Sequence, residues 1–168
     1  MSVGTGEHGL ISEFLNDSFR SEISRLGLPS TSKDMKIGIR SPRFTKGMPR
    51  WDTSRIPDVT VLPVEQMKAF AKREAVIELS EPPPILVVEV VSESTKLSDY
   101  RTKRSEYALL GILEYWIVDP LRELIAVCTL VEGFYDAVEF RGGERILSPT
   151  FPELYLTADQ IFAAGRLG

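Results

Sequence analysis

The sequence predicts a mixed α/β protein, in which helices flank a central β-sheet, and two observations predict this class. Short apolar runs typical of strands alternate with segments whose apolar residues repeat at helical spacing. The unit from Ile85 to Asp119 reads as strand, helix and strand, and it is long enough for a right-handed parallel crossover. We therefore expect one sheet with both parallel and antiparallel neighbours.

Each expected element follows from its own local pattern. Spacing of apolar residues and a following glycine define the long helices, whereas alternation or a buried-type Ile/Leu/Val run defines the strands. In chain order we predict a helix over 6–26, strands over 35–41 and 55–63, a short helix or turn over 65–73, a strand over 85–91, a helix over 97–110, a strand over 114–120, a hairpin of 123–133 with 135–143, and a helix over 157–165 capped by Thr157.

The composition is that of an ordinary globular protein. With 168 residues, 43% hydrophobic and 26% charged, residues 1–168 are expected to form a single domain with a sizeable core. No apolar run reaches membrane-spanning length and the N-terminus does not resemble a signal peptide, so we expect no membrane partner. The only cysteine, Cys128, is predicted to be a core residue, which favours a cytoplasmic location.

Charge is distributed unevenly along the chain. The net charge of -4 argues against a protein that coats nucleic acid with its whole surface, but residues 33–55 contain seven basic residues. This stripe is either a phosphate contact surface or a solvated loop whose charges aid solubility. The candidates for phosphate contact are Arg40, Arg43, Lys46, Arg50 and Arg55.

Three polar residues are expected to meet at the end of the strand over 85–91. Glu89 interrupts an apolar run, so it lies at a sheet edge, is paired with a cation, or binds a ligand. Asp58 follows Pro57, and Lys103 lies on the next helix. Two carboxylates and a lysine suit metal-assisted phosphodiester hydrolysis, because the carboxylates hold Mg²⁺ and the ammonium orients water or stabilises negative charge.

Helical spacing adds two residues to this group. Asp99, Lys103 and Tyr107 are four residues apart and share one face of the predicted helix. Asp99 is expected beside the site or as a helix cap, and Tyr107 either packs under the helix or lines the site with its hydroxyl. Lys103 could instead pair with Asp99 or Glu106. The only histidine, His8, is interpreted as an N-terminal turn residue, and a catalytic role is the less favoured alternative.

The order and spacing of several short motifs resemble a bacterial family of restriction endonucleases within the PD-(D/E)XK nuclease superfamily. The motifs are "GEHGLIS", "DTSRIPDVTVL", "ILVVEVVSEST", "DYRTKRSEYALLGILEYWIVDP" and "FPELYLTADQIF". The superfamily lysine normally lies two residues after the second carboxylate, but here that position is Val91. Members of this family also usually begin with an additional segment bearing a tyrosine–glutamate pair, which this chain is expected to lack.

The resemblance implies a restriction-endonuclease-like core and a Mg²⁺- or Mn²⁺-dependent endonuclease that acts on DNA. Carried onto this chain, it assigns Asp58 and Glu89 as catalytic metal ligands, aided by the carbonyl of Val90, and Lys103 as the relocated catalytic lysine. Because enzymes that cut both strands often pair two active sites, we expect a homodimer through the apolar hairpin near the C-terminus. The alternative is a catalytically inactive nuclease-fold scaffold that binds nucleic acid or protein.

Overall fold

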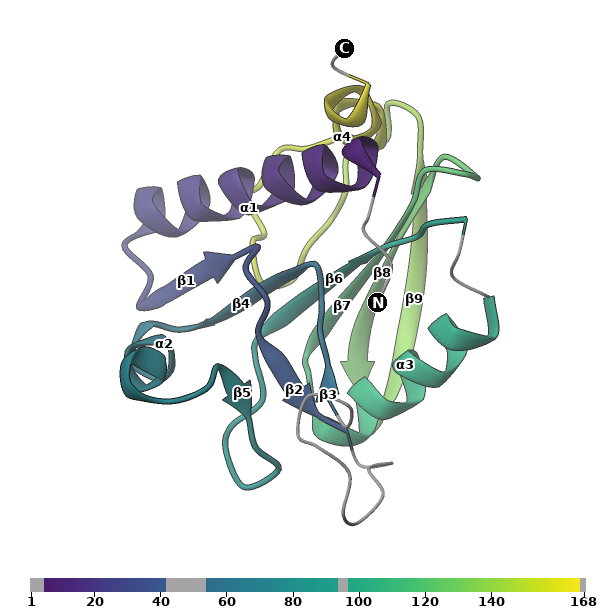
Figure 1. Cartoon of the computed structure of the whole chain (residues 1–168). Helices are drawn as coiled ribbons and strands as arrows, with labels where there is room; N and C mark the ends of the chain where they lie inside the picture. The colour runs from purple at the N-terminus through teal and green to yellow at the C-terminus, as the bar shows by residue number, and fades with distance from the viewer. Residues whose placement is uncertain (1–4, 42–53, 94–96, 167–168) are drawn as a thin grey trace.

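The main sheet is mixed and carries helices on both faces, as the sequence predicts. The computed structural model describes residues 5–41, 54–93 and 97–166, excluding the side chains of 97–99. Within this part of the chain, the main sheet has six strands in the order β1-β4-β6-β7-β8-β9 (Figure 1). Its strands are β1 (Ser30–Lys33), β4 (Val59–Pro63), β6 (Leu86–Val90), β7 (Glu114–Asp119), β8 (Leu124–Val131) and β9 (Phe134–Arg141).

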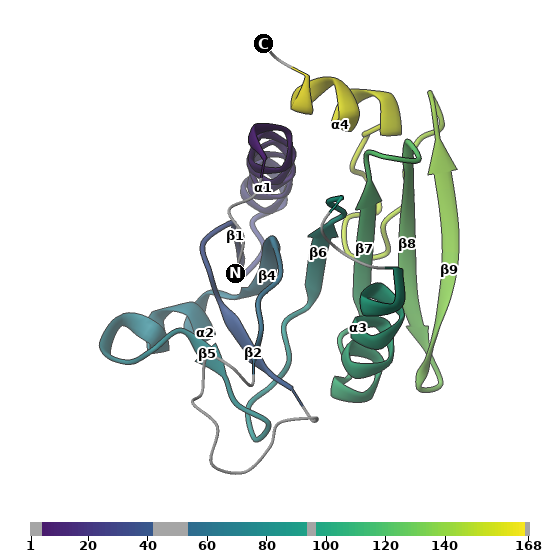
Figure 2. The ribbon, with the colours of Figure 1, turned by 45° about the vertical axis from the view of Figure 1, so that its right-hand side comes forward.

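Two hydrophobic clusters lie on opposite faces of this sheet. Helices α1 (Gly6–Leu26) and α4 (Ala158–Gly165) lie on one face, and α3 (Leu97–Leu110) lies on the other (Figure 2). On the α1 face, Phe19 packs edge-on against Trp116 and stacks on Phe151. On the α3 face, Tyr107 packs edge-on against Tyr115, with ring centroids 5.0 Å apart. Glu89 points to the α3 face, where it meets Tyr107.

The crossover predicted from Ile85 to Asp119 is confirmed as a parallel pair. β6 and β7 are parallel, with Leu86 opposite Glu114 and Val90 opposite Val118, and α3 connects them. The helix ends where predicted, at Gly111, whose φ of 81° is strained for residues with a Cβ. β6 pairs on its other side with β4 in antiparallel orientation. β6 is therefore an inner strand, and Glu89 does not lie on a sheet edge.

The predicted helices and hairpin at the two ends of the chain are also confirmed. α1 is capped by Thr5 and ended by Gly27, and the helix over 158–165 has a capping box between Thr157 and Gln160. β8 and β9 pair along their whole lengths across a turn at Glu132 and Gly133. β9 forms an edge of the main sheet.

A second sheet was only partly predicted. It has the order β3-β2-β5 in the described residues, with β3 at Ser54–Arg55, β2 at Gly38–Arg40 and β5 at Val76–Ile77. The strand predicted over 55–63 is divided into β3, which pairs with β2, and β4, which pairs with β1 and β6. Neither β1 nor β5 was predicted, since one is polar and the other very short. The region predicted as a short helix or turn contains α2 (Val64–Ala69) and a 3₁₀ turn over Phe70–Lys72.

Two further expectations concern the core and the membrane. Cys128 is fully buried, as predicted. None of the helices in the described ranges has both the length and the apolar character needed to cross a bilayer.

Candidate active site

A cleft of about 960 Å³ opens at the carboxyl end of β6. Its walls come mainly from the beginning of α1, the segment before β4, the end of β6 and the first turns of α3, with further residues between β1 and β2 and just after β7. All four of the main elements contribute residues to its lining, among them His8, Asp58, Glu89, Val90, Tyr100 and Lys103. The cleft therefore brings together residues that are spread over most of the first two thirds of the chain.

Asp58 is fixed by donors from two different elements. Its backbone N–H donates to the carbonyl of Val88, and its Oδ2 accepts the backbone N–H of Val90 at 2.7 Å. The Nε2 atom of His8 lies 3.0 Å from Oδ1. The carboxylate is thereby held beside Val90, the residue that follows Glu89, and both acidic residues line the same cleft.

Glu89 is a buried carboxylate with two partners from α3. Only 4% of the residue is exposed, its Oε2 lies 3.2 Å from Nζ of Lys103, and its Oε1 accepts the hydroxyl of Tyr107 at 2.8 Å. Burial raises the pKa of Glu89 to about 7; nearby Lys103 opposes this increase, whereas Asp58 adds to it. Glu89 can therefore exchange a proton near neutral pH.

The face of α3 predicted from spacing does point at Glu89. Lys103 and Tyr107 both contact this carboxylate, and Tyr100 donates its hydroxyl toward the carbonyl of Val90 at 3.4 Å. Tyr107 fills both roles considered from the sequence, because its ring packs against Tyr115 while its hydroxyl reaches the site. Burial and the charge of Glu89 raise the pKa of Tyr107 well above its usual value. The hydroxyl therefore keeps its proton and donates a hydrogen bond to Glu89.

The sequence did not predict the partner of His8. It lies in the first turn of α1, where its backbone N–H donates to the side chain of the capping Thr5. Its imidazole reaches across to Asp58, whose hydrogen bond and charge raise the pKa of His8. The signal was a single histidine in the first turn of an amphipathic helix, and only the packing of that helix over the sheet gives it a partner.

The donor set of the cleft fits a hard divalent cation. No three His, Cys, Asp or Glu side chains in the described residues are grouped to hold a metal ion. Mg²⁺, however, is commonly held by one or two carboxylates, with water and substrate phosphate completing its coordination. Asp58, Glu89 and the carbonyl of Val90 supply oxygen donors of this kind. The metal assignment stays a prediction that the chemistry of these groups supports.

The remaining predicted residues divide into two groups. Arg43, Lys46 and Arg50, and the side chain of Asp99, lie outside the described parts of the chain. Arg40 and Arg55 are described, and each contacts a carboxylate: Arg40 pairs with Glu78 at 3.2 Å, and Arg55 with Glu106 at 2.7 Å. Their contact with phosphate stays a prediction.

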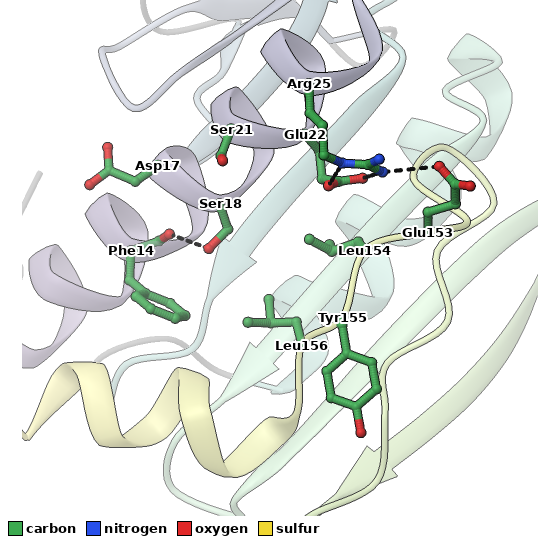
Figure 3. Close-up of a pocket in the computed structure, with 10 residues that line it drawn as sticks. All are labelled: Phe14, Asp17, Ser18, Ser21, Glu22, Arg25, Glu153, Leu154, Tyr155 and Leu156. Atoms are coloured by element: carbon green, nitrogen blue, oxygen red, sulfur yellow. Dashed lines mark hydrogen bonds and ion pairs between the residues drawn. The ribbon is translucent and has the colours of Figure 1, made fainter.

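A second pocket, which is more open than the cleft, lies beside α1. Its volume is about 680 Å³, and it lies between α1 and the segment Glu153 to Leu156 (Figure 3). Arg25 bridges its two walls by pairing with Glu22 and Glu153. In the described residues this pocket and the cleft have no lining residue in common, and the groups of the candidate site all belong to the cleft.

The family relationship agrees with this geometry. Residues 1–159 match the model of the Uma2 family, which is described as "Putative restriction endonuclease". The chain belongs to this family. The fold is similar to a crystal structure from Anabaena variabilis ATCC 29413, titled a putative nuclease belonging to DUF820, with a TM-score of 0.74 and 15% identity. That match covers 98% of this chain and 84% of the other, and it confirms the predicted nuclease-like fold. No curated protein matches the chain.

Proposed function

We propose that this member of the family is a Mg²⁺- or Mn²⁺-dependent endodeoxyribonuclease, which hydrolyses phosphodiester bonds in DNA. The observation that carries the proposal is the meeting of Asp58, Glu89 and Lys103 at one cleft, although 45 positions separate the first from the last. Two carboxylates and an ammonium are the groups that this chemistry requires. Membership of the family supplies the reaction class.

Each residue has a distinct part in the proposed reaction. Asp58, Glu89 and the carbonyl of Val90 hold the cation, which when bound polarises the scissile phosphate and lowers the pKa of water. The N–H of Val90 and the imidazole of His8 orient Asp58, and the hydroxyl of Tyr107 orients Glu89. Lys103 positions the attacking water and stabilises the negative charge that grows on the phosphate oxygens.

Glu89 also determines when the site can accept a cation. Because its pKa is raised to about 7, a bound proton competes with the cation at and below neutral pH. We therefore expect tighter cation binding at pH 8 than at pH 6. A cytoplasmic location belongs to the same proposal, since the buried thiol of Cys128 requires no oxidising compartment.

The decisive experiment combines calorimetry with a cleavage assay. We expect Mn²⁺ to bind wild-type protein at millimolar or lower concentration, and plasmid DNA to be cut only when Mg²⁺ or Mn²⁺ is present. Glu89→Ala should abolish both, while Glu65→Ala, on exposed α2, should change neither. Unchanged metal-dependent cleavage by folded Glu89→Ala protein would reject the assignment.

The homodimer is a finer part of the proposal, and the edge strand β9 supports it. Phe134 and Val138 are 79% and 55% exposed, and they project from the same face of this strand. Covering them with a second copy would remove apolar surface from water. Light scattering should give the mass of a dimer for wild-type protein and of a monomer for Phe134→Ser. A wild-type monomer at a concentration of tens of micromolar would contradict the dimer.

One observation favours the scaffold alternative. All four carboxylate oxygens of Asp58 and Glu89 already contact a donor from the protein: His8, Val90, Lys103 or Tyr107. The two acids are therefore stabilised without a cation, as an inactive relative would require. No heat of Mn²⁺ binding at millimolar concentration would favour the scaffold over the nuclease.

A further inference from the structure

The helix that carries Lys103 and Tyr107 is tied to the segment that carries Asp58 by an ion pair between Arg55 and a buried carboxylate, Glu106. Glu106 lies on α3 between Lys103 and Tyr107 in sequence and is only 3% exposed. The guanidinium of Arg55 donates from Nε to Oε2 at 2.7 Å and from Nη2 to Oε1 at 3.0 Å. Ser41, which follows β2, donates its hydroxyl to Oε2 at 3.1 Å. A planar two-point contact of this kind fixes orientation as well as distance.

The ion pair joins two positions that lie close, along the chain, to residues of the candidate site. Arg55 ends β3 and precedes Asp58 by three residues, whereas Glu106 follows Lys103 by three and precedes Tyr107 by one. The pair therefore connects the backbone that presents one acidic group to the helix that presents the partners of the other. Lys103 and Tyr107 each reach Glu89 through one hydrogen bond, at 3.2 Å and 2.8 Å. A rotation of α3 about its axis would displace both donors together.

We propose that Arg55 and Glu106 form a positioning pair, which sets the rotation of α3 so that Lys103 and Tyr107 meet Glu89. This inference rests on the proposed nuclease function for its kinetic consequence. It gives Arg55 a role in the shape of the site, where the sequence suggested contact with phosphate. The two roles predict different kinetics, because loss of a phosphate contact weakens DNA binding, whereas rotation of Lys103 slows the chemical step.

The kinetic test compares Glu106→Gln, Arg55→Lys and the double variant with wild-type protein. Loss of a supporting partner of this type costs about 10- to 100-fold. We expect each single variant to lower kcat to this extent with little change in KM for DNA, and the double variant to fall no further than the singles. Glu78→Gln, which changes the carboxylate paired with Arg40, is the matched control and should retain wild-type kcat. If Arg55→Lys raises KM while Glu106→Gln changes nothing, Arg55 contacts phosphate and the positioning role is wrong.

A second measurement does not depend on nuclease activity. Hydrogen exchange at the amides of α3 should accelerate in Glu106→Gln and in Arg55→Lys, relative to the amides of β7 and β8 in the same samples. Arg55→Lys keeps the positive charge, so it still decides the question if Glu106→Gln does not fold. If wild-type protein is inactive, the nuclease proposal is overturned, and hydrogen exchange at α3 alone tests the pair of Arg55 and Glu106. Unchanged exchange at α3 in folded variants would overturn the positioning pair.

Discussion

Two buried glutamates lie at opposite ends of the parallel pair β6–β7, and their surroundings differ. Glu114 begins β7, is 1% exposed, and accepts four hydrogen bonds, from Nε1 of Trp116, the hydroxyl of Ser148, and the N–H and hydroxyl of Thr150. Glu89 lies near the end of β6 and accepts from Lys103 and Tyr107. Glu89 also lines the large cleft, whereas Glu114 is not among the lining residues.

The comparison contrasts a carboxylate that is fully hydrogen-bonded inside the fold with one that is proposed to act in chemistry. Neutral and backbone donors surround Glu114 and satisfy its oxygens within the protein, so its contribution is to join β7 to the segment from Ser148 to Thr150. Glu89 is held by an ammonium and a phenol at the edge of a cleft, and burial raises its pKa to about 7. Burial alone therefore does not single out Glu89; its cationic partner, its raised pKa and its place on a cleft make it the candidate.

The largest expected effect separates the two glutamates by activity. Glu89→Gln should lower metal-dependent cleavage by more than about 100-fold, because a direct ligand matters more than the outer-shell groups whose loss costs that much. Glu114→Gln should retain activity at temperatures where it is folded. The measurement is plasmid cleavage in Mg²⁺ by both proteins. Equal losses in two folded variants would remove the distinction.

The second prediction concerns stability, for which the change at Glu114 should have a larger effect than the change at Glu89. Glu114→Ala should lower the free energy of unfolding by about 3 kcal/mol, because it removes the acceptor of the buried Trp116 and Ser148 and of the partly buried Thr150. Glu89→Ala should cost less, since burial already disfavours the charged form of Glu89 in the folded state, as its raised pKa indicates. Urea denaturation of both variants at pH 7 measures the difference. A greater loss for Glu89→Ala would contradict this interpretation.

The third prediction concerns pH. The pKa of Glu89 rises on folding from 4.5 to about 7, so the folded state holds this proton more tightly than the unfolded state. Its contribution to stability is therefore fully present below about pH 4.5 and is lost as pH rises through about 7. The raised pKa of His8 acts in the same direction, above its ordinary value of 6.5.

Urea denaturation between pH 4.5 and 8 should isolate the part due to Glu89. Wild-type protein should lose stability over this range more steeply than Glu89→Gln, in which residue 89 no longer titrates. Glu114→Gln serves as the control that keeps the wild-type slope. Parallel curves for wild type and Glu89→Gln would show that the burial of Glu89 does not affect its protonation.

The smallest expected effect tests the hydroxyl of Tyr107. Its hydrogen bond lowers the pKa of Glu89, so Tyr107→Phe should raise that pKa by somewhat less than one unit, equivalent to about 1 kcal/mol. The pH midpoint of Mn²⁺ binding, measured by calorimetry, should rise accordingly. Tyr135→Phe is a matched control, because that hydroxyl donates to the carbonyl of Ile112. A midpoint unchanged by Tyr107→Phe would show that this hydroxyl does not affect the pKa of Glu89.

Much of the fold was predictable because its signals are local. The apolar spacing of α1, the buried-type runs of β6 and β7, and the glycines that end α1 and α3 each determine structure within a few residues. The missed strands lack such signals. β1 reads "STSK", and it is a strand because its whole length pairs with β4. β5 is two residues long and exists through its pairing with β2.

The candidate site divides in the same way. The sequence by itself predicted that Asp58, Glu89 and Lys103 would meet, and it predicted the face of α3 that carries Tyr107. A charge in an apolar run, an aspartate after a proline and a four-residue helical spacing are all local patterns. Only the tertiary structure revealed that His8 contacts Asp58 and that Arg55 pairs with Glu106. The physical reason is that each of these partnerships joins elements distant in the chain, and their choice depends on how α1, α3 and β3 pack around the sheet.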